Sequence, residues 1–111
     1  MKSDVLYLGH ILNAISKIED YISSSNYETF KDNNMMVDAV VRELEIIGEA
    51  SNNLSEEFKR KNPEMPLRDA IDMRNFLAHE YFGVNTKVVW DTCKDDLIKL
   101  RKFVEERLQK L

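Results

Sequence analysis

The sequence predicts an all-α fold: an antiparallel up-and-down bundle of four main helices plus a short one, in a single domain over residues 1–111. Apolar residues recur every three or four positions through long segments, which is the spacing of one helix face. The chain holds only three Gly and two Pro, and its apolar runs do not alternate as those of a half-buried strand do. Each apolar stripe must be buried against another helix, which favours a bundle.

The first helix is predicted from Ser3 to about Ser23, with Ser3 and Asp4 suited to its N-terminal end. A polar connection follows, with a short turn around Tyr27 and Phe30. The apolar stripe of this helix consists of Val5, Leu8, Ile11, Leu12, Ile15, Ile18 and Ile22.

A second helix is expected to begin at Asp32 or Asn33, both good caps, and to reach about Ser51. Ser55 can cap a short basic segment that the pair Asn62-Pro63 ends. These signals place two helices of unequal length before the middle of the chain.

The third long helix is predicted from about Leu67 to Tyr81 or Phe82, because Pro66 can open it and Gly83 can end it. The last helix should be capped by Asn85 or Thr86. Its stripe consists of Trp90, Cys93, Leu97, Leu100, Val104, Leu108 and Leu111.

Composition limits the possible functions. The lone Cys93 cannot form an intramolecular disulfide, and the N-terminus lacks the apolar run of a signal peptide. Both features predict a cytoplasmic protein. No stretch approaches the roughly 20 apolar residues of a membrane span, so no membrane partner is expected. The net charge of −4 argues against a non-specific nucleic-acid coat. Any nucleic-acid activity therefore needs a local basic patch. Candidates for it are Lys59, Arg60 and Lys61, although short charged runs are more often solvated helix ends.

The run MRNFLAHEYFGVN, residues 73–85, carries the candidate site. Arg74 can hold a phosphate through two nitrogens and stabilise the extra charge of a transition state. His79 can take a proton from a ribose 2′-hydroxyl or give one to a leaving 5′-oxygen. This chemistry cleaves RNA without a metal or other cofactor. A structural role is the alternative: Arg74 would pair with Asp72 or Glu80, and His79 would bond a backbone carbonyl.

Helical spacing bears on how these residues meet. Arg74 and Tyr81 are seven residues apart and share a face, whereas His79 lies about 140° round from Arg74. Two arrangements would bring them to one site: the helix end unwinds near Gly83, or two subunits meet along this helix and each supplies part of the set. The spacing favours the dimer without requiring it. On the second helix, Gly48 fits close approach of the motif helix, and Glu49 is a candidate to orient Arg74 or His79. His10 is interpreted as a structural or surface residue.

The pattern of Arg, four residues, His, one residue and Tyr resembles the signature of the HepT-like family of the HEPN superfamily. The flanking blocks RELEIIGEASNNLS and VVWDTCKDDLIKL also look like family segments, in the family's order. The resemblance implies a homodimeric toxin ribonuclease that acts on RNA through catalytic Arg74 and His79, with Asn75 supporting the RNA phosphate. It further implies a minimal nucleotidyltransferase antitoxin as partner, which attaches AMP to Tyr81. Leu67 departs from the family, where many relatives carry Trp.

Two other functions remain open from the sequence. One is a non-catalytic module that binds nucleotide or serves as the partner of a nucleotidyltransferase. The other is a helical dimerisation domain with a structural Arg-His pair. His79→Ala separates the nuclease from the binding module, because the nuclease loses its activity whereas the module retains most of its affinity. For a structural Arg-His pair, Arg74→Ala and His79→Ala should each lower thermal stability.

Overall fold

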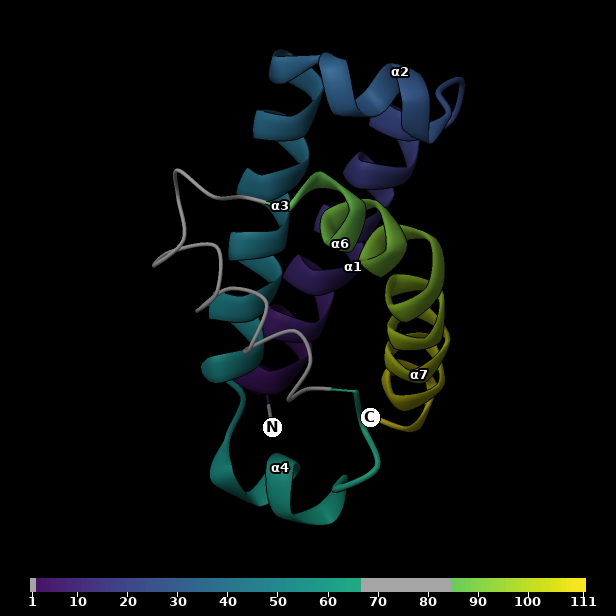
Figure 1. Ribbon diagram of the computed structural model, residues 1–111. Helices are drawn as coiled ribbons and strands as arrows, with labels where there is room; N and C mark the ends of the chain where they lie inside the picture. The colour runs from purple at the N-terminus through teal and green to yellow at the C-terminus, as the bar shows by residue number, and fades with distance from the viewer. Residues whose placement is uncertain (1, 67–84) are drawn as a thin grey trace.

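The computed structural model describes residues 2–66 and 85–111, and every regular element in these ranges is helical (Figure 1). The predicted all-α class is therefore confirmed. The elements in chain order are α1 (Lys2–Ile22), α2 (Tyr27–Asp32), α3 (Asn34–Asn52), α4 (Glu56–Lys61), α6 (Thr86–Asp91), the π-helical turn η2 (Thr92–Asp96) and α7 (Leu97–Lys110). The predicted third long helix, with Leu67 and Gly83, lies outside the described residues.

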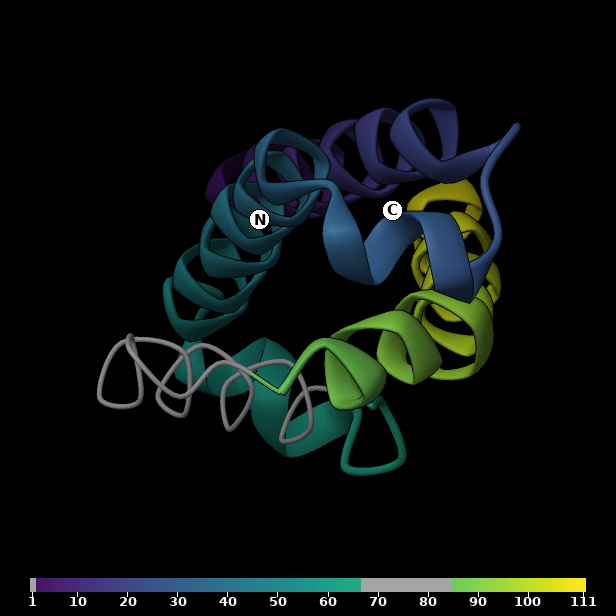
Figure 2. The same ribbon diagram turned by 45° about the horizontal axis from the view of Figure 1, so that its top comes forward.

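The long helix α1 is central to the arrangement. It runs antiparallel to α3 and to α7 and packs against both, as Figure 1 shows. The short helix α2 crosses the end where α1 stops, and it contacts α3 and α6 (Figure 2). The core lies between these helices, and its largest fully buried side chains include Phe30, Leu8, Ile11, Ile15, Ile18 and Ile47.

Side-chain caps begin the helices where the sequence predicts them. Asn33 Oδ1 accepts from Met36 N at 3.0 Å at the start of α3. Ser55 Oγ accepts from Phe58 N at 3.0 Å at the start of α4. Asn85 Oδ1 accepts from the first backbone amides of α6, at 3.0 and 3.2 Å. Each bond satisfies an amide that has no partner within its own helix.

The predicted stripe of α1 is wrong at Val5, which is 43% exposed. Asp4, one position earlier, is only 2% exposed and takes its place on the buried face. The reason is a tertiary contact: the Asp4 carboxylate accepts hydrogen bonds from Ser55 N and Ser55 Oγ. A carboxylate can be buried when its oxygens are hydrogen-bonded in this way.

The last predicted helix is not one regular α-helix. The π-helical turn η2 separates α6 from α7, and the ribbon changes direction there (Figure 1). The Thr92 hydroxyl donates to the Val88 carbonyl at 2.8 Å, a back-bond of the kind that often bends helices. The stripe is otherwise buried through Val104, but Leu111 is exposed, which corrects its predicted place in the core.

Candidate functional site

The four residues predicted to act, Arg74, Asn75, His79 and Tyr81, lie outside the described residues. The structure instead describes how the chain is held on both sides of the segment that carries them. The segment follows Pro66 and precedes Asn85.

The turn before Pro66 is fastened to the last helix. Arg107 Nε donates to Asn62 Oδ1 at 2.5 Å, and Arg107 Nη2 donates to Glu64 Oε1 at 2.5 Å. Met65, which is buried, closes the turn by donating its amide to Asn62 O at 3.1 Å. Hydrogen bonds from its own backbone N–H and from Arg107 lower the pKa of Glu64. The chain therefore approaches the motif from a turn that α7 holds by two hydrogen bonds.

The chain that follows the motif is fastened to α2. The hydroxyls of Tyr27 and Thr86 lie 3.1 Å apart in a hydrogen bond that spans fifty-nine residues. The Tyr27 ring also lies 6.3 Å from the ring of Trp90 in α6, and Phe30 packs on Trp90 at 5.1 Å. These contacts fix the first turn of α6 just after the motif.

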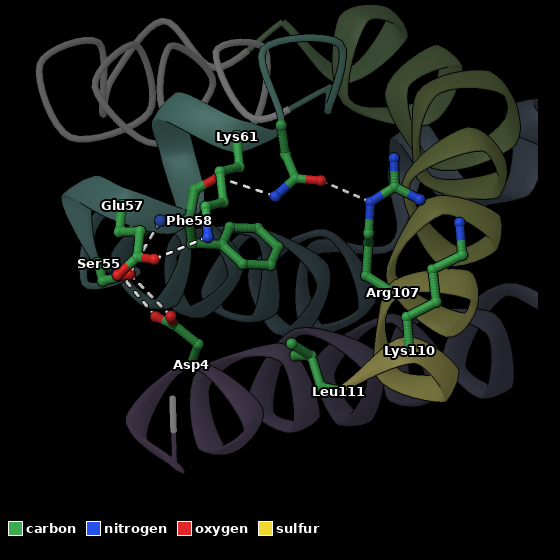
Figure 3. A pocket seen from close by; sticks show the side chains of 9 residues that line it. Asp4, Ser55, Glu57, Phe58, Lys61, Arg107, Lys110 and Leu111 are labelled. Atoms are coloured by element: carbon green, nitrogen blue, oxygen red, sulfur yellow. Dashed lines mark hydrogen bonds and ion pairs between the residues drawn. The ribbon is translucent and has the colours of Figure 1, made fainter.

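A pocket between α4 and the end of α7 lies beside the turn that precedes the motif (Figure 3). Its charged lining mixes both signs: Asp4 and Glu57 are acidic, and Lys61, Arg107 and Lys110 are basic. Lys61 Nζ bonds Glu57 at 2.8 Å, and this hydrogen bond lowers the pKa of Glu57. Most of these charges are therefore already paired inside the protein.

The basic run predicted as an RNA rim is largely occupied by local contacts. Lys59 Nζ donates to Asn52 O at 2.9 Å and lies 3.5 Å from Glu56. Lys61 pairs with Glu57 on the same helix. Arg60 is exposed, and its side chain makes no hydrogen bond or ion pair with the described residues. The run does not form a free patch of three cations.

Glu49 and His10 border one shallow pocket between α1 and α3, together with Tyr7 and Asn53. The rings of Tyr7 and His10 meet edge to face with their centres 5.9 Å apart. The predicted surface or structural role of His10 agrees with its exposure. The suggested contacts of Glu49 with Arg74 or His79, and of Gly48 with the motif helix, involve residues outside the described ranges.

The buried polar residues of α3 were missed by the sequence interpretation. Glu43 is only 7% exposed, and Ser51 is fully buried with an Oγ that has no hydrogen-bond partner in the described part of the chain. Helical spacing gave a signal for both, because Glu43 and Ser51 lie four residues before and after Ile47, a core residue.

Cys93 is a core residue, as predicted. Burial raises the pKa of its thiol to about 12, so almost no thiolate exists near neutral pH. A nucleophilic role for Cys93 is thereby disfavoured.

The described ranges limit the kinds of site that they can form. Among residues 2–66 and 85–111, no three His, Cys, Asp or Glu side chains cluster in a way that could hold a metal ion. In the same ranges, no helix combines the length and apolar character that crossing a membrane requires.

Comparison with known proteins identifies the family. The family described as "Ribonuclease HepT-like" matches residues 11–107. The "Probable ribonuclease HepT" of Thermococcus cleftensis is 45% identical over 105 residues, which cover 94% of each chain. The "Putative RNase TTE0752" of Caldanaerobacter subterraneus subsp. tengcongensis is 40% identical over 110 residues, covering 99% of this chain and 98% of that protein. No solved structure gives a significant match. Because the family match spans most of the chain, the protein belongs to the HepT-like ribonuclease family.

Proposed function

We propose that the protein is the toxin of a toxin-antitoxin system, a metal-independent endoribonuclease that uses Arg74 and His79. Its enzyme class, ribonuclease, follows from the family. The observation that carries the finer proposal is the arrangement of Arg74, His79 and Tyr81 within residues that the family match covers. We expect such a protein to act in the cytoplasm, because RNA is present there and a lone cysteine stays reduced there.

The proposed cleavage is an internal transesterification. His79 takes the proton of the ribose 2′-hydroxyl, and the 2′-oxygen attacks phosphorus while the bond to the 5′-oxygen breaks. The 5′-oxygen receives its proton from the partner subunit's His79. Arg74 stabilises the negative charge that gathers on the phosphoryl oxygens, and Asn75 supports the same phosphate. The products are a 2′,3′-cyclic phosphate and a 5′-hydroxyl.

A homodimer fits this chemistry better than a monomer. Arg74 and His79 are five residues apart, a spacing that corresponds to about 140° on a regular α-helix, so one such helix would not easily aim both side chains at one phosphate. Two motif helices that meet across a two-fold axis supply two copies of each residue to one cleft. Size measurement of the active species tests this part.

Tyr81 is the proposed point of control. Its Oη attacks the α-phosphorus of ATP in the nucleotidyltransferase antitoxin, pyrophosphate leaves, and AMP stays on the phenol oxygen. The added phosphate brings negative charge and bulk beside the cleft that must hold RNA. Mass spectrometry after incubation with antitoxin and ATP should show AMP on wild type and none on Tyr81→Phe.

The decisive experiment is cleavage of a labelled RNA pool in EDTA by wild type and by His79→Ala, with intact mass confirming unmodified Tyr81. Wild type should cut and leave cyclic-phosphate ends. The variant should be slower by a factor of roughly 10² to 10⁴, the usual contribution of general acid-base catalysis. Absence of cleavage by unmodified wild type would contradict the proposal and favour a non-catalytic nucleotide-binding or partner module.

A further inference from the structure

Three lysines, one each from α2, α6 and η2, lie beside two neighbouring aromatic rings. Lys87 Nζ lies 5.0 Å and Lys31 Nζ lies 6.0 Å from the centre of the Tyr27 ring. Lys94 Nζ lies 4.9 Å from the centre of the Trp90 ring. These distances fall within the range of cation–π attraction, so the rings help to hold the ammonium groups in place. We call Lys31, Lys87 and Lys94 the lysine face.

The Trp90 ring is buried, and the half-buried Tyr27 ring has Lys31 and Lys87 over it, so neither ring is freely open to stacking by a base. Trp90 is only 9% exposed and packs on Phe30, and the Tyr27 hydroxyl is engaged by Thr86. All three lysines, in contrast, are exposed. The surface therefore presents positive charge without an aromatic platform, which suits a phosphate backbone better than a nucleobase.

The ion pairs between the lysine face and its acidic neighbours are weak. Lys87 pairs with Asp91 at 3.2 Å, and the two side chains are 58% and 51% exposed. Lys31 pairs with Glu28 at 3.0 Å, also at the surface. Exposed pairs of this kind contribute about 0–1 kcal/mol, so a phosphate can replace the carboxylate at little loss.

The lysine face is also close to the motif along the chain. Lys87 follows Tyr81 by six residues and His79 by eight. A fully extended chain spans at most about 3.6 Å per residue, so the Cα of Lys87 lies within roughly 22 Å of that of Tyr81 and 29 Å of that of His79. An RNA strand of several nucleotides can span these distances.

We propose that the lysine face binds the phosphate backbone of the RNA substrate beside the scissile phosphate, and that it supplies affinity without reading sequence. This inference rests on the proposed ribonuclease function. The pocket beside α4 is a poorer candidate, because its Arg107 is engaged by two hydrogen bonds, to Asn62 and to Glu64. On a chain with a net charge of −4, a group of exposed lysines, two of which follow the motif closely in sequence, is a surface that attracts phosphate.

The test measures binding separately from cleavage. The probe is a mixed-sequence 2′-O-methyl RNA, which lacks the attacking hydroxyl and is not cut, and its Kd is determined over a range of salt concentrations. The test variant is the triple substitution Lys31→Gln, Lys87→Gln and Lys94→Gln. The matched control, Lys99→Gln with Lys102→Gln and Lys110→Gln, removes three exposed lysines of α7.

The expected result follows from counterion release. Each phosphate contact on a single strand adds about 0.7 to the slope of log K against log salt, so losing three should reduce the slope by about 2. The same change weakens binding by roughly 10- to 100-fold near 0.1 M salt. The control triple should leave slope and Kd near wild type. A triple Lys→Arg variant of the lysine face keeps the charge and should bind as wild type does.

An unchanged slope in the folded Lys→Gln triple would overturn the inference, and so would equal losses in the control triple. Weaker binding of the nucleotidyltransferase with unchanged RNA binding would overturn it as well, and would assign the face to a protein partner. Cleavage of ordinary RNA by wild type is scored separately. If wild type cleaves RNA and the Lys→Gln triple keeps the wild-type salt slope, only the RNA-binding role of the lysine face is refuted. If the triple has a reduced slope but wild type does not cleave RNA, only the ribonuclease proposal is refuted.

Discussion

Asp4 and Ser55 are fifty-one residues apart and share two hydrogen bonds: Asp4 Oδ1 accepts from Ser55 N at 2.8 Å, and Asp4 Oδ2 accepts from Ser55 Oγ at 2.7 Å. The same Ser55 Oγ accepts from Phe58 N at the start of α4. One carboxylate thus ties the first turn of α1 to the cap of α4. The contact joins the beginning of the chain to the helix that precedes the motif.

Asp4→Ala should lower the free energy of unfolding by about 1–3 kcal/mol, because it leaves a partly buried amide and hydroxyl of Ser55 without their acceptor. Ser55→Ala should have a similar effect, since it removes the cap as well. Chemical denaturation of both variants and the double variant measures the coupling, which should exceed about 0.5 kcal/mol. Asp38→Ala, at an exposed position of α3, is the control and should change stability by less than about 0.5 kcal/mol. Additive effects of Asp4 and Ser55 would contradict the shared contact.

Tyr27→Phe should cost about 0.5–1.5 kcal/mol, because it removes only the hydroxyl that bonds Thr86 and leaves the ring on Trp90. Thr86→Val should cost a similar amount, and the double variant little more than either. Thermal unfolding followed by circular dichroism measures these differences. Tyr21→Phe, at an exposed tyrosine of α1, serves as the control and should match wild type. An equal effect of Tyr21→Phe would show that the Thr86 contact is not the cause.

Cys93 should resist alkylation in the folded protein. Its thiol has a pKa of about 12 because it is buried, so at pH 8 the reactive thiolate is almost absent. Iodoacetamide labelling should be slow under native conditions and should become fast in denaturant. Rapid native labelling would show that the thiol is accessible and ionised.

The same shift makes stability depend on alkaline pH. The folded pKa lies above the ordinary value of 9.0, so the folded state retains the proton that the unfolded state loses. This contribution is fully present below pH 9 and is lost as the pH rises from there toward 12. The free energy of unfolding should therefore fall more steeply with pH for wild type than for Cys93→Ala, which lacks the titrating thiol. Parallel curves for the two proteins would contradict this assignment.

The caps at Asn33, Ser55 and Asn85 could be predicted because each depends on a side chain and backbone amides two or three residues away. The exposure of Val5 could not be predicted, because the spacing of apolar residues does not show that Asp4 bonds a residue fifty-one positions later. The turn η2 was missed for a related reason. The apolar residues of the last predicted helix keep helical spacing through η2. The hydrogen bond from the Thr92 hydroxyl to the Val88 carbonyl, which accompanies the bend, does not alter that spacing.

The site shows the same division. The residue types of the motif predict its chemistry, because a cation that holds phosphate and an imidazole that moves protons are readable from sequence. Its surroundings are not readable in this way. The contacts of Arg107 with Glu64 and of Tyr27 with Thr86 span forty-three and fifty-nine residues, and local patterns do not encode which distant side chains will meet.

Arg107→Gln should loosen the turn that leads into the motif. Both of its donors to that turn, Nε to Asn62 and Nη2 to Glu64, disappear, while the rest of the bundle keeps its core. Hydrogen exchange at the Met65 amide, which closes the turn, should quicken by about tenfold or more, corresponding to roughly 1.4 kcal/mol of local stability. Amides of α1 and α3 should change much less.

Loosening this turn should also slow RNA cleavage. A turn that no longer fixes the start of the motif segment should lower the kcat of RNA cleavage more than it raises KM, because positioning matters most in the transition state. Arg107→Lys keeps the charge beside Glu64 but loses the Nε bond to Asn62, so it should restore activity only in part. Lys110→Gln, which removes a charge from the same pocket but no hydrogen bond to the turn, is the control. If Arg107→Gln quickens Met65 exchange and leaves kcat unchanged, the turn stabilises the fold but does not position the catalytic residues.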